Sequence, residues 1–282
     1  PTSLSSTHAI AGGYDPAWLT RRDADGVVLA EALRAFGGDP EAIAGLARDP
    51  ACAIGYLEIH IEQGPVLERA GLPVGVVTAI NAAYRADCVV RGEAGHAGTV
   101  PMALRRDALA GVAEMVGAIE RLAADIPDAV ATVGRISAMP GAVNVVPGEV
   151  RFSIDARAPA DATLAALVAE IDAACATVAS RRGLDFACTP FMRAPATAMD
   201  HGLQQAFDDA ARKFGVNAPR IPSGAGHDAV AMAGLCPVGM LFVRCAGGIS
   251  HNPAESVDED DLGIAVAVMI EAILAVARAQ GG

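Results

Sequence analysis

The chain has 282 residues, enough for one large domain or two of ordinary size. Hydrophobic residues make up 52% of it and charged residues 19%, which excludes the disordered class and allows a substantial core. The formal net charge of −12 argues against a nucleic-acid partner, because phosphate binding needs clustered lysine and arginine. No membrane span and no secretory signal are expected, since the longest apolar candidate, Ile264–Ala279, is interrupted by Glu271. These features predict a cytoplasmic protein.

Six cysteines are scattered along the chain without any CxxC pair. Most of them lie in apolar runs, which indicates buried, reduced thiols. Only Cys245, close to a glycine-rich motif, is left open. Lys213 is the only lysine and lies in a polar helical stretch, so Schiff-base chemistry is not indicated.

The first eighty residues predict a loop, two short helices and a strand. Apolar spacing gives a helix over residues 29–36, and Asp39 followed by proline begins a second one. Apolar and polar residues then alternate over residues 56–65, as in a strand with one polar face. That polar face carries Glu58, His60 and Glu62.

The middle third predicts the order strand, helix, strand, strand, helix, strand. The strands are expected near residues 84–91, 131–136, 150–157 and 185–191. The first helix carries its apolar stripe from Leu104 to Leu122, and the second begins at an Asp161 cap. This βαββαβ order is that of a ferredoxin-like unit, which is a compact domain in its own right.

After Pro195 the pattern returns to α/β. It predicts, in order, a helix near 203–214, a glycine-rich loop at 223–228, an apolar strand at 238–243 and a helix led by Asp258. The predicted fold is therefore α/β: residues 1–81 and 197–282 form one α/β domain, and residues 82–196 are inserted into it as a lid.

Three histidines occupy positions from which an imidazole can point into a cleft. His60 lies on the polar face of a strand, His96 between two glycines, and His251 in a turn after two glycines. Neutral imidazole is the commonest protein ligand of zinc-like metals, although each histidine alone is also compatible with simple packing.

Other polar residues lie in apolar or glycine-rich surroundings, and each has both a functional and a purely structural interpretation. Arg157 ends a strand, where it either clamps a substrate carboxylate or forms a salt bridge to Asp155 or Glu149. Asn144 caps a turn or contacts a substrate. The loop 223–226 offers backbone N–H groups to an anion but lacks the Lys-Ser/Thr ending of a nucleotide-binding P-loop.

Five sequence strings occur together and in a fixed order. They are Tyr56-Leu-Glu-Ile-His-Ile-Glu-Gln-Gly-Pro65, Gly92-Glu-Ala-Gly-His-Ala-Gly-Thr-Val-Pro-Met102, Asn144-Val-Val-Pro-Gly148, Ser223-Gly-Ala-Gly-His-Asp228 and Gly248-Ile-Ser-His-Asn-Pro-Ala-Glu255. This set resembles the amidohydrolases of allantoate and N-carbamoyl-L-amino acids, which are M20-type dinuclear metallohydrolases. The resemblance runs over essentially the whole chain.

The resemblance implies a metal-binding α/β domain, an inserted ferredoxin-like lid that also forms a homodimer, and two divalent ions, zinc or manganese. It implies that His60 and His251 are metal ligands and that His96 is catalytic, stabilising the oxyanion on the ureido carbonyl. The substrate-binding residues that it implies are Gln63, Arg85, His96, Asn144, Arg157 and the Gly226 backbone.

The implied reaction is hydrolysis of a C–N bond in a small ureido or amidine substrate, with allantoate first and N-carbamoyl-L-amino acids or beta-ureidopropionate as the alternative. An M20 peptidase or aminoacylase is a weaker reading. The family's upstream His, bridging Asp and Glu-Glu pair have no counterpart in residues 1–282. We therefore expect an N-terminally truncated member, for which a catalytically inactive dimerising module is the alternative of another class.

Overall fold

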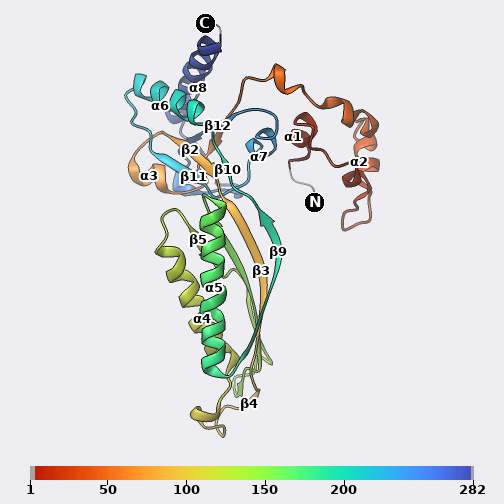
Figure 1. Ribbon diagram of the computed structural model, residues 1–282, viewed down its shortest axis with the longest axis vertical. Helices are drawn as coiled ribbons and strands as arrows, with labels where there is room; N and C mark the ends of the chain where they lie inside the picture. Colours follow the sequence, from red (N-terminus) through yellow and green to blue (C-terminus); the bar gives the residue numbers. More distant parts are fainter. Residues whose placement is uncertain (1–3, 281–282) are drawn as a thin grey trace. The chain divides into compact units, whose positions relative to one another are not determined.

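The computed structural model describes residues 4–280, which divide into two compact units (Figure 1). One unit combines the chain up to Ile80 with the chain from Thr197 onward, and the other is Asn81–Ala196. Helices and strands alternate along the chain, so the α/β fold class predicted from the sequence is confirmed.

The first unit is built on a five-stranded sheet. Its strands are β1 (Tyr56–Ile61), β2 (Val74–Ile80), β10 (Thr197–Ala198), β11 (Arg220–Ser223) and β12 (Val238–Val243). β12 lies between β1, which is parallel to it, and β2, which is antiparallel. β11 and β10 pair with β2, so β1 is an edge strand among the described residues.

Strand β12 contains only apolar residues and a glycine because both of its faces are buried. Met240 and Phe242 pack with Leu67 in one core, and Leu241 packs with Phe207 in the other. The apolar face of β1 joins this second core. The polar face of β1 is thereby turned the opposite way, as the alternation in the sequence predicts.

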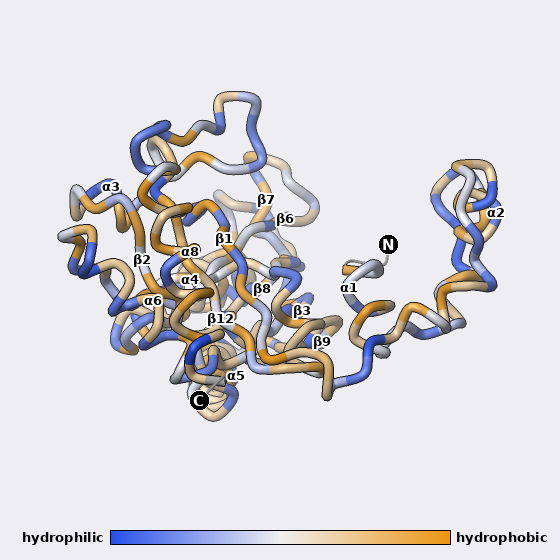
Figure 2. The backbone as a smooth tube through the Cα atoms, turned by 90° about the horizontal axis from the view of Figure 1, so that it is seen from above, coloured by the Kyte–Doolittle hydropathy of each residue, from blue (hydrophilic) through white to orange (hydrophobic). Residues whose placement is uncertain are grey.

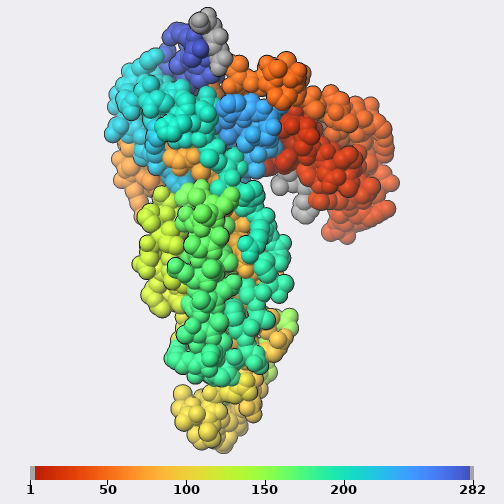
Figure 3. Space-filling model, in the orientation of Figure 1, coloured from red at the N-terminus to blue at the C-terminus, as the bar shows by residue number. Residues whose placement is uncertain are grey.

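Helices cover both faces of this sheet. α6 (His201–Lys213) and α8 (Glu259–Gln280) pack on each other and on the strands at one face. α3 (Val66–Ala70) and α7 (Ala229–Met232) contribute to the core on the other. α1 (Ser5–Ile10) contacts α7, where the Thr7 hydroxyl donates to Asp228 at 2.6 Å; in Figure 3 the red surface of the first residues adjoins the blue surface near α7.

Between α1 and β1 the chain forms one further α-helix and three 3-10 helices. They are η1 (Pro16–Thr20), α2 (Leu29–Ala35), η2 (Pro40–Leu46) and η3 (Pro50–Cys52). The predicted helix after Asp39 is a 3-10 helix, and the Asp39 carboxylate caps it by accepting from the Glu41 N–H.

Helix α8 has one buried and one exposed apolar face. Its buried face includes Ala265, Val268 and Ala272. The exposed stripe, 40–52% accessible, consists of Leu262, Val266, Ile270, Ile273 and Leu274, and Figure 2 draws most of this helix in orange. α8 and α5 (Asp161–Arg182) are the two helices of the described residues that are long and apolar enough to cross a membrane, by length and composition only. One or two such helices are weak evidence of a membrane span, since a core helix passes the same test, so the expectation of no span stays a prediction.

The second unit is an antiparallel sheet covered by two helices. Its strands are β3 (Ala82–Arg91), β5 (Val130–Thr132), β6 (Ile136–Met139), β8 (Glu149–Ala158) and β9 (Asp185–Ala194), and β4 (Gly95–His96) pairs separately with β7 (Val145–Val146). The order is β5-β8-β3-β9, with β6 also pairing with β8. One strand was predicted over residues 131–136; it is instead two short strands, both paired with β8.

Helices α4 (Ala108–Ala124) and α5 pack on each other and share one core with the sheet. α4 begins at Ala108 because Asp107 caps its first N–H groups, so Leu104 lies outside it, in η4 (Met102–Leu104). The predicted Asp161 cap was also wrong. Asp161 is already helical, and its carboxylate accepts from the Ala196 N–H instead.

Candidate metal centre

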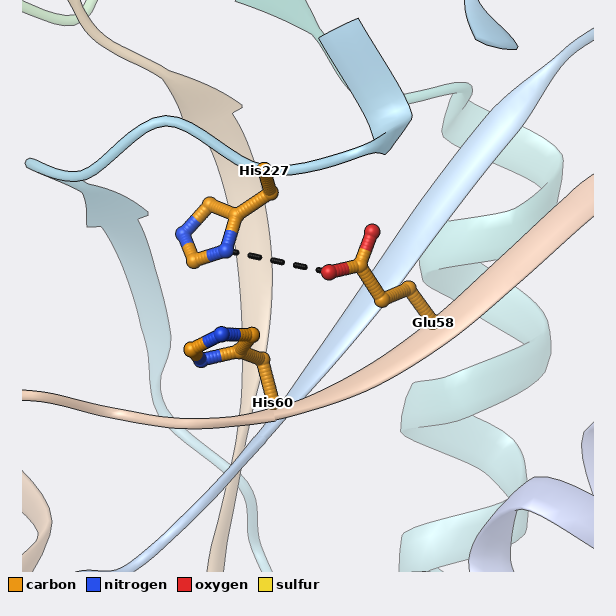
Figure 4. A group of neighbouring side chains, drawn as sticks. All are labelled: Glu58, His60 and His227. Carbon is orange, nitrogen blue, oxygen red and sulfur yellow. Dashed lines mark ion pairs between the residues drawn. The ribbon is translucent and has the colours of Figure 1, made fainter. Parts of the chain in front are cut away.

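Three side chains of the first unit meet at the polar face of β1 (Figure 4). Glu58 and His60 are two residues apart on this strand and therefore share a face, and His227 comes from the loop before α7. One ligand atom from each of the three lies within 4.8 Å of the others. The two imidazole rings are 4.4 Å apart between centroids, and His227 Nδ1 lies 3.7 Å from a Glu58 oxygen.

The imidazole of His227 is buried and held from one side. Its Nε2 lies 2.6 Å from Ser223 Oγ, and the two residues are 3% and 1% exposed. Desolvation by burial, with the neighbouring His60, lowers the pKa of His227 to about 4, so the ring is neutral at neutral pH. Its Nδ1 is buried with no hydrogen-bond partner among the described residues. A buried polar atom of this kind calls for a ligand, and a metal ion would supply one.

The orientation of His60 also favours metal binding. Its Nδ1 lies 2.8 Å from the carbonyl oxygen of Ile61, which only accepts, so Nδ1 carries the proton and donates. The lone pair of Nε2 is then free for a metal ion, because a backbone carbonyl commonly fixes the tautomer of a ligating histidine in this way.

Glu58 completes the group with a carboxylate. It accepts from the Ala229 N–H at 3.1 Å and from the Tyr56 hydroxyl at 3.2 Å. Burial raises the pKa of Glu58, while these two donors act in the opposite direction. Two imidazoles and a carboxylate are ligands that suit zinc and manganese alike, so the residues present fit a divalent ion.

His60 is the one predicted metal ligand that the structure places in this group. His251 is exposed, has a φ of +56°, and its backbone N–H donates to Glu255. Its loop nevertheless lies beside the end of β1, because Gln63 Nε2 donates to Ser250 Oγ at 2.8 Å. Gly226 is exposed and directly precedes His227.

The predicted residues of the second unit fall into two pairs. His96 lies opposite Val145 in the β4–β7 ribbon, and the Ala97 N–H donates to the Asn144 carbonyl, so His96 and Asn144 are neighbours; both are exposed. Arg85 and Arg157 both donate to Asp155, at 2.7–2.8 Å.

Of the two carboxylates considered for Arg157, the structure therefore shows Asp155 as a partner. The two guanidiniums, Arg157 first, hold the pKa of Asp155 below its ordinary value. Glu149 pairs with Arg91 and Arg151 instead.

Glu58 and His227 were not among the residues selected from the sequence. Glu58 was recognised only as part of the polar face of β1. His227 lies in the glycine-rich loop that was considered for its backbone N–H groups. Its signal was a histidine placed directly before an apolar helix, which becomes meaningful only when β1 is known to pass beside it.

The fold and this cluster together define a mixed α/β protein with a candidate divalent-metal centre. A family model described as peptidase family M20/M25/M40 matches residues 29–275. The chain belongs to this family, as its five motifs suggest, and the family supports the use of divalent metal ions.

Named relatives extend over nearly all of the chain. It is 36% identical over 277 residues to the N-carbamoyl-L-amino acid amidohydrolase of Geobacillus stearothermophilus, covering 98% of this chain and 68% of that protein. It is 38% identical over 292 residues to the allantoate deiminase of Arabidopsis thaliana, covering 93% of this chain and 56% of that protein. The match to an amidase of the hydantoinase/carbamoylase family from Burkholderia multivorans has a TM-score of 0.91 at 35% identity, covering 98% of this chain and 67% of that one.

Proposed function

We propose that this chain carries the chemistry of a metal-dependent amidohydrolase acting on a non-peptide C–N bond of a small ureido or amidine compound. The observation that supports it most directly is the Glu58, His60 and His227 group, with its unpartnered His227 Nδ1, in a member of the M20 family. When bound, a divalent ion in such a site supplies Lewis-acid activation of water and of the carbonyl oxygen.

The side chains of the first unit would act as follows. His60 and Glu58 bind the ion from the edge strand, and His227 binds it through Nδ1 while Ser223 holds its Nε2. The motif resemblance adds His251 as a metal ligand, and Gln63 and the Gly226 backbone as substrate contacts. The Gln63–Ser250 hydrogen bond keeps the loop after β1 next to the loop that carries His251.

In the second unit, His96 would stabilise the developing oxyanion, as the resemblance implies, and Asn144 lies beside it. Arg85 and Arg157, ordered by Asp155, would bind the substrate carboxylate. We expect His96→Ala to lower kcat by about 10²–10³-fold with little change in KM, since losing an oxyanion donor affects the transition state most.

The substrate proposed first is allantoate, followed by N-carbamoyl-L-amino acids. Relatives of similar identity carry both names, 38% for the allantoate deiminase and 36% for the N-carbamoyl-L-amino acid amidohydrolase. Release of ammonia from each compound, compared as kcat/KM, decides between them. No release from either, in a chain that does hold metal, would contradict the proposed reaction.

Metal content tests the centre independently of activity. The purified chain is incubated with zinc or manganese, and bound metal is measured by elemental analysis. His60→Ala is expected to lose at least one ion per chain under either assignment of ligands. His227→Ala removes metal only if the group seen in the structure is the site, and His251→Ala only if the resemblance assigns the ligand correctly. His201→Ala, an exposed histidine at the start of α6, is the control and keeps full content.

A homodimer formed through the second unit and a cytoplasmic location are further proposals carried over from the sequence. Sedimentation that shows only monomer would contradict the first, and recovery in the membrane fraction of cells would contradict the second. A chain that dimerises but binds no metal and releases no ammonia would favour the inactive dimerising module.

A further inference from the structure

We propose that Cys88 and Cys188 form a peroxide-reactive dithiol site in the second unit. Cys188 is the nucleophile that hydrogen peroxide oxidises, and Cys88 then closes a reversible disulfide. The proposal is independent of the metal centre, which lies in the other unit.

The two thiols are already in contact. Cys88 on β3 and Cys188 on β9 are register partners in an antiparallel pair of strands, and their sulfur atoms are 2.9 Å apart. Directly opposed residues in such a pair have Cα atoms about 4.5 or 5.5 Å apart, depending on the hydrogen bonding. Both separations fall within the range of roughly 4.4–6.8 Å that a disulfide spans. The bond can therefore form without displacement of either strand.

The environment makes the two sulfurs chemically different. The Cys88 thiol donates to Cys188, and the Tyr84 hydroxyl lies 3.7 Å from the same sulfur. These donors, Cys88 first, lower the pKa of Cys188 to about 7, whereas the same bond to Cys188, together with burial, raises the pKa of Cys88. Burial, followed by the charges of Asp172 on α5 and Asp87 on β3, acts on the pKa of Cys188 in the opposite direction without reversing the shift. A substantial fraction of Cys188 is then thiolate near neutral pH, with its resolving thiol adjacent.

Access also separates these cysteines from the others. β9 is an edge strand of its sheet, and Cys188 is half-buried, whereas Cys88 and Cys175 are fully buried. Cys188 packs against the core of this unit but keeps partial solvent exposure, so of the two thiols it is the one open to a small oxidant. Cys52 is exposed and Cys236 is buried, and none of the contacts of the described residues brings a second thiol to either.

Hydrogen peroxide is the two-electron oxidant that converts the two thiols into a disulfide. The Cys188 thiolate attacks one peroxide oxygen, so an S–O bond forms, the O–O bond breaks and hydroxide leaves. Cys88 then attacks the sulfur of the sulfenic acid; the S–S bond forms, the S–O bond breaks, and the departing hydroxyl takes the Cys88 proton to leave as water. A small thiol such as glutathione reverses the result by thiol–disulfide exchange.

Peptide mapping of the full chain tests the proposal. After peroxide treatment, remaining thiols are alkylated and the protein is digested with trypsin. The expected product links Ala-Asp-Cys88-Val-Val-Arg to Gly-Leu-Asp-Phe-Ala-Cys188-Thr-Pro-Phe-Met-Arg, and it disappears after reduction. Both cysteines remaining alkylatable at a peroxide dose that oxidises exposed Cys52 would overturn the proposal, as would a disulfide to any other cysteine.

Two variants check the assigned roles. Cys88→Ala is expected to trap Cys188 as a sulfenic acid that dimedone labels, and to move the inflection of the peroxide reaction above pH 7, because the donor that lowers the Cys188 pKa is removed. Cys188→Ser should leave Cys88 unoxidised, and Cys236→Ser should behave like the wild type. Oxidation of Cys88 in the Cys188→Ser variant, or an unchanged pH profile in Cys88→Ala, contradicts the assignment.

Discussion

Two atoms of His227 have opposite environments, and this asymmetry is the main feature of the site at the scale of single residues. Nε2 contacts Ser223, while Nδ1 is buried without a partner and faces Glu58 and His60. An imidazole fixed on one side by a hydroxyl and open on the other is prepared to bind a cation without further rearrangement.

The lowered pKa of His227 predicts a pH dependence of stability in the chelator-treated chain. Its value of about 4 lies below the 6.5 of an unperturbed histidine, so between these pH values the unfolded chain binds the additional proton. The free energy of unfolding should therefore fall as the pH drops from 6.5 to 4, by less than about 1.4 kcal/mol per pH unit. Denaturant titrations at several pH values measure this slope.

The control separates His227 from Glu58, whose raised pKa acts in the opposite sense over part of the same range. His227→Gln should lose the contribution of the histidine, so that stability falls less as the pH drops. His201→Gln should retain the wild-type slope. Identical slopes in all three proteins would show that His227 does not titrate as its burial implies.

Gly248 lies where the loop that carries His251 comes closest to the loop after β1, which carries Gln63 and Gly64. Its φ is +64°, and a Cβ there would lie 2.7 Å from the carbonyl carbon of Gly64. Gly248→Ala should push apart the loops that carry Gln63 and His251, and lower the melting temperature. Gly215→Ala is the matched control, because φ there is +74° with no atom within 4 Å of the added Cβ. If both variants lose the same stability, only backbone strain matters and the close approach does not.

The sequence was sufficient for part of the site. The alternation around His60 placed that residue correctly on the polar face of a strand, because strand periodicity is a local property. Its partnership with His227 depends on which loop folds over that face, about 170 positions further along the chain. The Arg157–Asp155 pair was foreseen as one of two possible salt bridges; the two residues share a face of β8, whereas Glu149 pairs with Arg91 and Arg151.

At the scale of elements, α3 is a five-residue helix whose start is fixed by a side chain outside it. Both oxygens of Glu62, which is 9% exposed, accept at 2.7 Å from the N–H groups of Val66 and Leu67. Glu62→Ala should lower the free energy of unfolding by about 2 kcal/mol, because the N–H groups of Val66 and of the buried Leu67 lose a charged acceptor.

Denaturant unfolding checks this prediction against Glu120→Ala, an exposed position on α4. We expect less than about 0.5 kcal/mol there. A comparable loss in both variants would mean that the Glu62 carboxylate contributes no more than a surface residue.

Long elements were predicted better than short ones. Strands β3, β8 and β12 and helix α5 match their apolar patterns, because packing on a core imposes that periodicity. The exceptions lie at ends: Asp161 was assigned as a cap, yet its carboxylate binds a backbone N–H 35 residues away. A hydrogen bond to a residue so distant along the chain cannot be predicted from the local sequence pattern.

At the scale of the whole molecule, the two crossings between the units run as neighbours. Ile80 pairs with Thr197 at the end of the first sheet, and Ala83 pairs with Ala194 at the start of the second. The second unit also has its own buried core. We expect residues 81–196 expressed alone to fold cooperatively, with a single unfolding transition by circular dichroism. A non-cooperative melt would show that this unit depends on the rest of the chain.

The paired crossings have a consequence for how the gene can be rearranged. Because entry and exit of the second unit are adjacent, its coding segment can be replaced by a short glycine-containing turn that joins Ile80 to Thr197 as a hairpin. A circular permutant of the excised unit, with its natural ends linked and new termini opened in the exposed stretch around Val143, should retain the same sheet. The second unit is therefore expected to tolerate deletion, circular permutation and reinsertion as a single segment.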